Sequence, residues 1–257
     1  MSDKEEAYFY LPSSVKSKTS IENTISHYVT FLTAPIRMLD GFEYEIALIK
    51  VLYPFTASNL YDGKIEYWSY EENDVTFSRI TEGIYTDFPG KLLEEFKLAL
   101  DLDSEYYILT FDNISNKFAL SLTSPLGSKI TPYINFSKNL QTLTGFSETV
   151  KGTKKISSVD SGDSSGGLQN MYCYCNLVDN VNIGDTVAPI LAVINYKSSG
   201  ETQGVFEPSN PIYLPLSIKI IDNIVIEFRT KTGAYFPFTS GEVTAVLHIR
   251  PKRFTRI

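Results

Sequence analysis

Two cysteines are the residues of this chain whose type and spacing first suggest chemistry. Cys173 and Cys175 are its only thiols, and on a strand they point to the same face. Their Cα atoms would then lie roughly 6.5–7 Å apart, at or beyond the usual disulfide limit. Two thiols without neighbouring histidines are also too few for a zinc site. We therefore expect two buried free thiols in a reducing compartment.

A serine in a glycine-rich segment is the second candidate. Residues 162–167 read Gly-Asp-Ser-Ser-Gly-Gly, which is similar to the nucleophile region of trypsin-like proteases. A nucleophilic serine needs a histidine base and an acid that orients it. The chain has only His27 and His248, and no motif places either beside this segment. The composition favours a mobile loop.

Paired carboxylates occur at Glu71–Glu72 and Glu94–Glu95. Glu94 and Glu95 are expected to form the solvated side of a helix. The sequence shows no metal-ligand cluster, no phosphate loop and no nucleophile with its base. We therefore expect no enzyme activity, no cofactor, and no catalytic, cofactor-binding or metal-binding residue.

The composition is typical of a folded globular chain with a substantial core. Its 257 residues are 43% hydrophobic and 21% charged, with a net charge of −7, and a β-sandwich can use this length as one domain. The mild acidity argues against a nucleic-acid-binding module, which would show a basic stripe. The first residues are acidic without an apolar run, and no run of about 18 apolar residues occurs, so neither a signal peptide nor a membrane span is expected.

Period-two alternation dominates and indicates half-buried strands. The clearest cases are 224–229, 243–250 and 43–53. In 43–53 the apolar face switches near Ile49, so this strand is either buried on both faces from there on or carries a bulge near Ile49. A further strand is expected near 213–220. The predicted class is all-β, a single jelly-roll β-sandwich spanning residues 27–250.

A helix–hairpin–helix insertion at about 81–150 interrupts this pattern. A helical stripe covers 91–100, a hairpin spans 106–123, and a second short helix at 137–143 ends at Gly145. A flexible Ser/Gly-rich linker, 151–169, follows.

Both ends of the chain are set apart by composition. Residues 1–26 are predicted to be an N-terminal arm with an aromatic island at 8–11 that docks on its own body or on a neighbour. Residues 251–257 form a basic C-terminal tail that contacts either packaged DNA or acidic neighbours. His248, on the face opposite Leu247 and Ile249, is either a structural residue or a titrating group at an interface.

An ordered set of short segments resembles the minor capsid (penton) proteins of Polinton/Maverick elements, adintoviruses and virophages. The resemblance covers nearly the whole chain and lies in Leu11-Pro12-Ser13-Ser14, Pro35-Ile36, Tyr53-Pro54, Phe136-Ser137-Lys138-Asn139-Leu140, Met171-Tyr172-Cys173-Tyr174-Cys175, Tyr213-Leu214-Pro215-Leu216 and Leu247-His248-Ile249-Arg250. The linker at 151–169 and the basic tail depart from the family pattern.

The resemblance implies a structural capsid protein: a single jelly roll that forms pentamers at the fivefold vertices of an icosahedral shell. A double-jelly-roll major capsid protein would make the rest of that shell. The implied location is the virion, assembled inside the host cell in the cytoplasm or nucleus. Candidate assembly contacts are Tyr8, Phe9, Tyr10, Leu11, Arg253 and Arg256.

The alternative is a jelly-roll glycan- or receptor-binding module. Tyrosines and a tryptophan between residues 61 and 70 could then stack on sugar rings: Tyr61, Tyr67, Trp68 and Tyr70.

Overall fold

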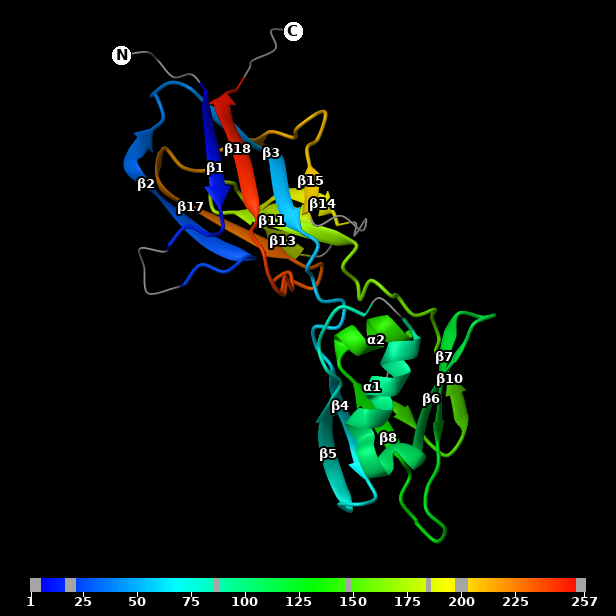
Figure 1. Cartoon of the computed structure of the whole chain (residues 1–257). Helices are drawn as coiled ribbons and strands as arrows, with labels where there is room; N and C mark the ends of the chain where they lie inside the picture. Colours follow the sequence, from blue (N-terminus) through cyan, green and yellow to red (C-terminus); the bar gives the residue numbers. More distant parts are fainter. Residues whose placement is uncertain are drawn as a thin grey trace. The chain divides into compact units, whose positions relative to one another are not determined.

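The computed structural model describes residues 6–16, 22–85, 88–146, 149–183, 186–196 and 203–252. These divide into two compact units (Figure 1). Unit 1 combines the two ends of the sequence, residues 1–57 and 168–257, and unit 2 is the intervening Ser58–Gly167. Each unit is described by itself below.

Two antiparallel sheets build unit 1. The first has the order β1-β18-β3-β15, formed by β1 (Ala7–Pro12), β18 (Thr244–Pro251), β3 (Tyr44–Pro54) and β15 (Gln203–Phe206), and the short β16 (Leu214–Pro215) also pairs with β3. The second has the order β14-β11-β17-β2, formed by β14 (Ile190–Asn195), β11 (Asn170–Cys175), β17 (Ile220–Arg229) and β2 (His27–Arg37). A small hairpin, β12 (Val181–Ile183) with β13 (Thr186–Ala188), accompanies them.

The order in which the chain visits the two sheets identifies a jelly roll. Along the sequence, β1, β3, β15 and β18 belong to the first sheet, whereas β2, β11, β14 and β17 belong to the second. The chain therefore crosses between sheets after β1, β2, β3, β14, β16 and β17. Eight antiparallel strands arranged in this way form the two Greek keys of a jelly roll. The predicted all-β jelly-roll class is confirmed.

Alternating side chains explain why these segments form the sandwich. Along β18, Ala245, Leu247 and Ile249 are fully buried, and along β17 the same holds for Ile224, Ile226 and Phe228. Apolar residues at every second position of a strand share one face, so each sheet buries that face against the other. The register between β18 and β3 shifts between Val246 and Leu247, opposite Ile49, where a bulge is one of the two structures that the switch of apolar face predicts.

Unit 2 contains two small sheets and two helices. One sheet has the order β5-β4-β8-β9, from β5 (Asp74–Arg79), β4 (Lys64–Ser69), β8 (Tyr133–Phe136) and β9 (Val150–Lys151); the other has the order β10-β7-β6, from β10 (Lys155–Ser157), β7 (Lys117–Leu122) and β6 (Tyr107–Asp112). The helices are α1 (Gly90–Leu100), continued by the 3-10 helix η1 (Asp101–Glu105), and α2 (Lys138–Thr144). In Figure 1, α1 and α2 lie between the β4–β5 hairpin and the β6–β7–β10 sheet.

The helices of unit 2 begin and end where the sequence indicates. The Ser137 hydroxyl accepts a hydrogen bond from the Leu140 N–H, and Gly145 ends α2 in the left-handed region at φ 75°. In α1, Leu92, Phe96 and Leu100 are buried, as the helical stripe predicts, and they join a core with residues of both sheets.

Three boundaries expected from the sequence differ in the structure. Residues 7–12 form strand β1 of the sandwich rather than an arm, because Phe9 and Leu11 are buried beneath the first sheet. The inserted unit begins at Ser58, well before 81, because β4 pairs with β8 and not with a sandwich strand. It also includes most of the segment expected to be a linker, 151–169, since β9 and β10 pair with β8 and β7.

Candidate functional site

The outer face of the first sheet carries two adjacent exposed tyrosines. Tyr8 and Tyr10 project from edge strand β1, with 55% and 71% of their surface exposed, while Phe9 and Leu11 point into the sandwich. Beside Tyr10 lie Val246 and Lys50 in the register of the sheet. The pleat of the strand therefore divides the predicted aromatic island. Phe9 and Leu11 pack in the core of the sandwich, and Tyr8 and Tyr10 face outward. We refer to the outward half, Tyr8 and Tyr10, as the tyrosine edge.

His248 lies directly behind the tyrosine edge. It is 6% exposed, and its ring is stacked on that of Tyr8, with centroids 4.3 Å apart and 6° between the planes. Its Nδ1 lies 2.7 Å from the Tyr213 hydroxyl, and its Nε2 lies 3.4 Å from a Glu6 carboxylate oxygen. These contacts join β1, β18 and the segment before β16 on one face of the sheet.

The basic residues that lead into the C-terminal tail are paired with acids of the same unit. Arg250 Nε donates to Glu45 at 2.7 Å, and its guanidinium lies 3.4 Å from the centre of the Tyr213 ring. Lys252 Nζ donates to Glu43 at 2.8 Å. Arg250 and Lys252 therefore contact acidic residues of their own unit. Arg253 and Arg256 lie outside the described residues.

The outer face of the second sheet carries a cluster centred on Arg229. Its guanidinium lies 4.5 Å from the centre of the Tyr235 ring and 5.5 Å from that of Tyr174, and Nε donates to Glu227 at 2.6 Å. The bond to Glu227 raises the pKa of Arg229. Tyrosine and arginine are enriched at energetically important positions of protein interfaces, so this second face has a composition suited to contact with a protein.

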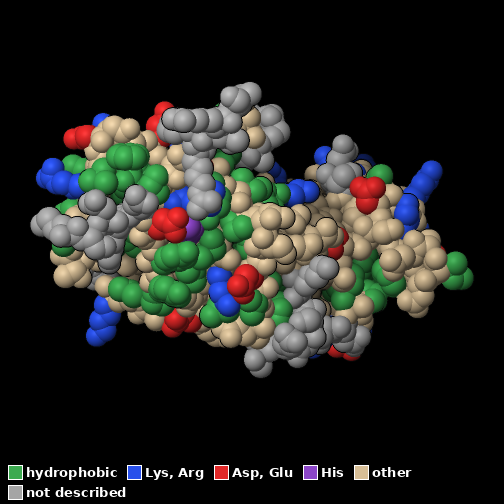
Figure 2. Space-filling model, turned by 90° about the horizontal axis from the view of Figure 1, so that it is seen from above, with side chains coloured by type: hydrophobic (Ala, Val, Ile, Leu, Met, Phe, Trp, Pro, Cys, Tyr) green, Lys and Arg blue, Asp and Glu red, His purple; other side chains and the backbone are tan. Residues whose placement is uncertain are grey.

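Apolar side chains also reach the surface elsewhere. On the face seen in Figure 2, hydrophobic side chains cover continuous areas, with Lys, Arg, Asp and Glu scattered between them.

The residues suggestive of chemistry have local structural roles. Cys173 and Cys175 are both buried and free, and burial raises the pKa of the Cys175 thiol to about 12 and that of Cys173 well above its usual value. Within the described ranges, no three His, Cys, Asp or Glu side chains are grouped so that they could hold a metal ion. No helix in the same ranges is long and apolar enough to cross a membrane.

The glycine-rich segment 162–167 is a hydrogen-bonded turn. Asp163 accepts from the Ser165 N–H and hydroxyl, at 2.9 and 2.6 Å, and from the Gly167 N–H at 3.2 Å. The Ser165 hydroxyl is thus engaged by a carboxylate within its own turn. His27 lies beside Glu227 and His248 beside Tyr213, both in unit 1.

The Asn139 side chain connects this turn by hydrogen bonds to residues 59–62, where the chain enters unit 2. Its side-chain oxygen accepts from the Tyr61 and Asp62 N–H groups, and its Nδ2 donates to the Asn59 and Gly166 carbonyls. The side chain is buried with all four of its hydrogen-bonding positions used. Sequence reasoning missed this residue, because a single asparagine in a short helix gives no signal of such a role.

The four aromatic residues considered for sugar stacking pack within unit 2. Tyr67 is buried against Tyr107, with ring centroids 5.5 Å apart, and Tyr70 lies against Tyr106 at 4.9 Å. Tyr61 and Trp68 are half-buried. All four are less exposed than Tyr8 and Tyr10 of the tyrosine edge.

No protein-family model matches this sequence, and no curated protein matches it either. Among solved structures, the chain is similar to the crystal structure of the selenomethionine-labelled mavirus penton protein. The two chains are 12% identical, the TM-score is 0.45, and the match covers 96% of this chain and 100% of that chain.

Proposed function

We propose that this protein is a structural subunit of an icosahedral viral capsid, and specifically a penton protein that closes as a ring of five at the fivefold vertices. The observation that carries the proposal is the strand order of unit 1, β1-β18-β3-β15 facing β14-β11-β17-β2. Jelly rolls of this order build viral capsids and also lectin and cupin domains. The ordered sequence resemblance to penton proteins favours the capsid among these uses.

A ring of five needs two different complementary surfaces on each subunit, because its contacts are heterologous. Unit 1 offers two: the tyrosine edge on the first sheet and the Arg229 cluster on the second. Both combine exposed aromatic area with hydrogen-bonding groups. Phe9 and Leu11 serve assembly indirectly in this proposal, by holding β1 in the sheet.

The remaining partners follow from the same proposal. A double-jelly-roll major capsid protein surrounds the ring in the virion, which assembles in the reducing interior of the host cell. Arg253 and Arg256 contact packaged DNA or acidic groups of neighbouring subunits. Loss of DNA binding on deletion of residues 251–257, with a strong dependence on salt, would select the first of these contacts.

Light scattering on the purified full chain tests the proposal. We expect a mass of five chains, either alone or after mixing with the major capsid protein. A monomer under both conditions, together with no incorporation into shells, would contradict it. Binding to a glycan array by such a monomer would favour the receptor-binding alternative instead.

A further inference from the structure

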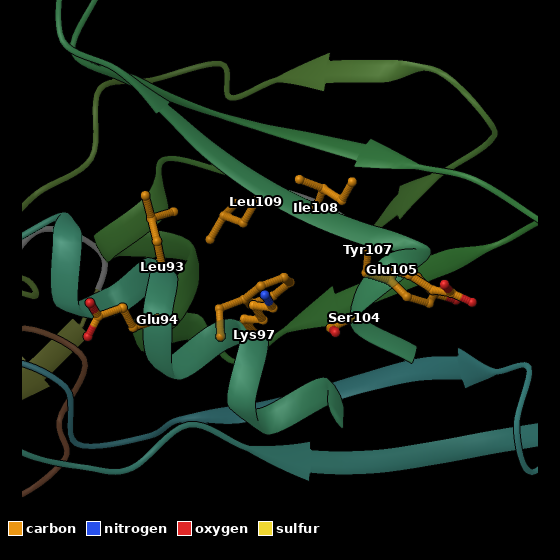
Figure 3. A pocket seen from close by; sticks show the side chains of 9 residues that line it. Leu93, Glu94, Lys97, Ser104, Glu105, Tyr107, Ile108 and Leu109 are labelled. Atoms are coloured by element: carbon orange, nitrogen blue, oxygen red, sulfur yellow. The ribbon is translucent and has the colours of Figure 1, made fainter. Parts of the chain in front are cut away.

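An open groove separates helix α1 from strand β6 in unit 2. Its volume is about 610 Å³, and its lining includes Leu93, Glu94, Lys97, Glu105 and Leu109. In Figure 3, Leu93 from α1 and Leu109 from β6 point toward each other across the groove, and Glu94 and Glu105 lie toward its opposite ends. The groove therefore has leucines across its width, a carboxylate toward each end and Lys97 between the two carboxylates.

The strand that forms one wall of the groove is an edge strand. β6 pairs with β7 on one side, and the order β10-β7-β6 gives it no second neighbour in the part of the chain that the structure describes. The Thr123 N–H donates to the Tyr106 carbonyl, whereas the Phe118 carbonyl accepts from the Ser158 N–H on the β10 side. In an antiparallel ladder these directions alternate, so the backbone groups of Leu109 and Phe111 point away from β7.

An unpaired strand edge beside an apolar groove is suited to receive an extended peptide. Added strands gain main-chain hydrogen bonds from the edge and specificity from the pockets that receive alternate side chains. The exposed Ile108 side chain, 47% accessible, offers apolar contact on the other face of β6. The occupant should therefore be extended, with apolar side chains on both faces and a basic side chain on the groove side.

Residues 253–257 of this chain have that chemistry. They read Arg-Phe-Thr-Arg-Ile, with two cations three residues apart, so each face of an extended strand carries one arginine. Phe254 and Ile257 fall on opposite faces of such a strand. The lining of the groove contributes Glu94 and Glu105 against a single Lys97, so its charge is opposite to that of the tail.

We propose that residues 253–257 of one copy add as a strand to β6 of a neighbouring copy, with the arginine on the groove side of the added strand facing Glu105. This inference rests on the proposed assembly for the presence of a neighbouring copy. It gives the tail a protein partner and makes unit 2 a connector between subunits.

Peptide binding tests the groove without requiring assembly. A fluorescent peptide of residues 250–257 is titrated into the full chain lacking 253–257 and followed by anisotropy. We expect saturable binding that weakens at least tenfold with Glu105→Lys in the protein or with Arg253→Glu and Arg256→Glu in the peptide. Glu71→Lys, an exposed acid of unit 2 outside the groove, is the matched control and should leave the affinity unchanged.

Hydrogen exchange tests the same contact in the intact chain. The amides of Leu109 and Phe111 should exchange at least tenfold more slowly in the full chain than in the chain lacking 253–257, and the difference should grow with protein concentration. Protection that does not depend on concentration would contradict a second copy as the donor. Equal exchange in both chains with no peptide binding would overturn the proposal, even where light scattering finds a ring of five.

Discussion

The ring of Tyr8 lies parallel to that of His248, 4.3 Å away, and holds an exposed residue of edge strand β1 against a buried residue of β18. On the other side of His248, the Tyr213 hydroxyl lies within hydrogen-bond distance of Nδ1. Three segments far apart in the sequence therefore meet at one imidazole. Tyr8 of the tyrosine edge therefore stacks on a histidine that is itself within hydrogen-bond distance of Tyr213.

Tyr213→Phe tests this support. The variant keeps the ring but leaves Nδ1 of a buried histidine without its partner, so unit 1 should lose about 1–2 kcal/mol of stability. Exposure of Cys173 and Cys175 to a thiol reagent during urea unfolding reports on unit 1, which contains both. Tyr10→Phe removes the hydroxyl of a largely exposed side chain and is the control; an equal loss in both variants would contradict the role given to Tyr213.

Asn139→Ala tests the closure of unit 2. The variant removes the partner of two N–H groups and two carbonyls at the point where the chain enters and leaves the unit. We expect a loss of about 3 kcal/mol, since buried polar groups without partners are costly. Trp68, the only tryptophan, lies in unit 2 and reports its unfolding by fluorescence. Lys138→Ala, an exposed position of the same helix, should change the midpoint little, and an unchanged midpoint for Asn139→Ala would show that the closure depends on other contacts.

The two thiols should be unreactive in the folded protein. Burial raises the pKa of Cys175 to about 12 and that of Cys173 well above its usual value, so almost no thiolate forms at pH 8. An aromatic disulfide reagent should react with neither thiol in buffer and with both in guanidinium chloride. Rapid reaction of one thiol in buffer would show that the second sheet opens locally.

The raised pKa values of the two thiols also predict how the stability of the protein changes with pH. Unfolded thiols ionise near pH 8.5, whereas the folded ones keep their protons to higher pH. The folded state therefore binds more protons above pH 8.5, and stability should fall as the pH rises from there toward about 12. Replacing both cysteines with alanine should flatten the decline over this range. A decline of the same steepness in that variant would assign the effect to other groups.

Tyr10→Glu tests the tyrosine edge as an assembly surface. The side chain is 71% exposed, so the unfolding midpoint should stay nearly constant while the mass found by light scattering falls from that of the proposed ring of five to that of one chain. Ile114→Glu, at an exposed position of the β6–β7 turn, is the matched control and should leave assembly intact. Assembly of the Tyr10 variant at normal strength would remove the tyrosine edge from the interface.

Local patterns were sufficient to predict much of the fold. The helical stripe and the cap residues place α1 and α2 within one residue of their observed ends, and the change of apolar face near Ile49 marks the bulge in β3. These features depend on neighbours in the sequence. The strand expected near 213–220 is wrong in extent, because only Leu214–Pro215 pairs with β3 before β17 begins at Ile220, and Pro211 and Pro215 lack the N–H that a ladder needs.

The remaining features depend on which segments pair, and a single sequence does not contain that information. Residues 64–70 and 75–80 favour two strands, but only the pairing of the first with β8 and of the second with the first shows that they belong to unit 2. Tyr8 and Tyr10 were singled out by composition, whereas Tyr213 reaches the same place through the path of the fold. The Arg229 cluster likewise forms across β11 and β17.

The position of β18 has a consequence for biosynthesis. This strand pairs with β1 on one side and β3 on the other, so the first sheet cannot close until residues 244–251 have left the ribosome. Unit 2 is continuous in sequence and can fold earlier, when β1 and β3 are still unpaired because β18 has not been made. Nascent or truncated chains without β18 would expose two strand edges, which are sites of aggregation. A closed sandwich therefore requires β18, although this strand is made long after the two strands that it joins.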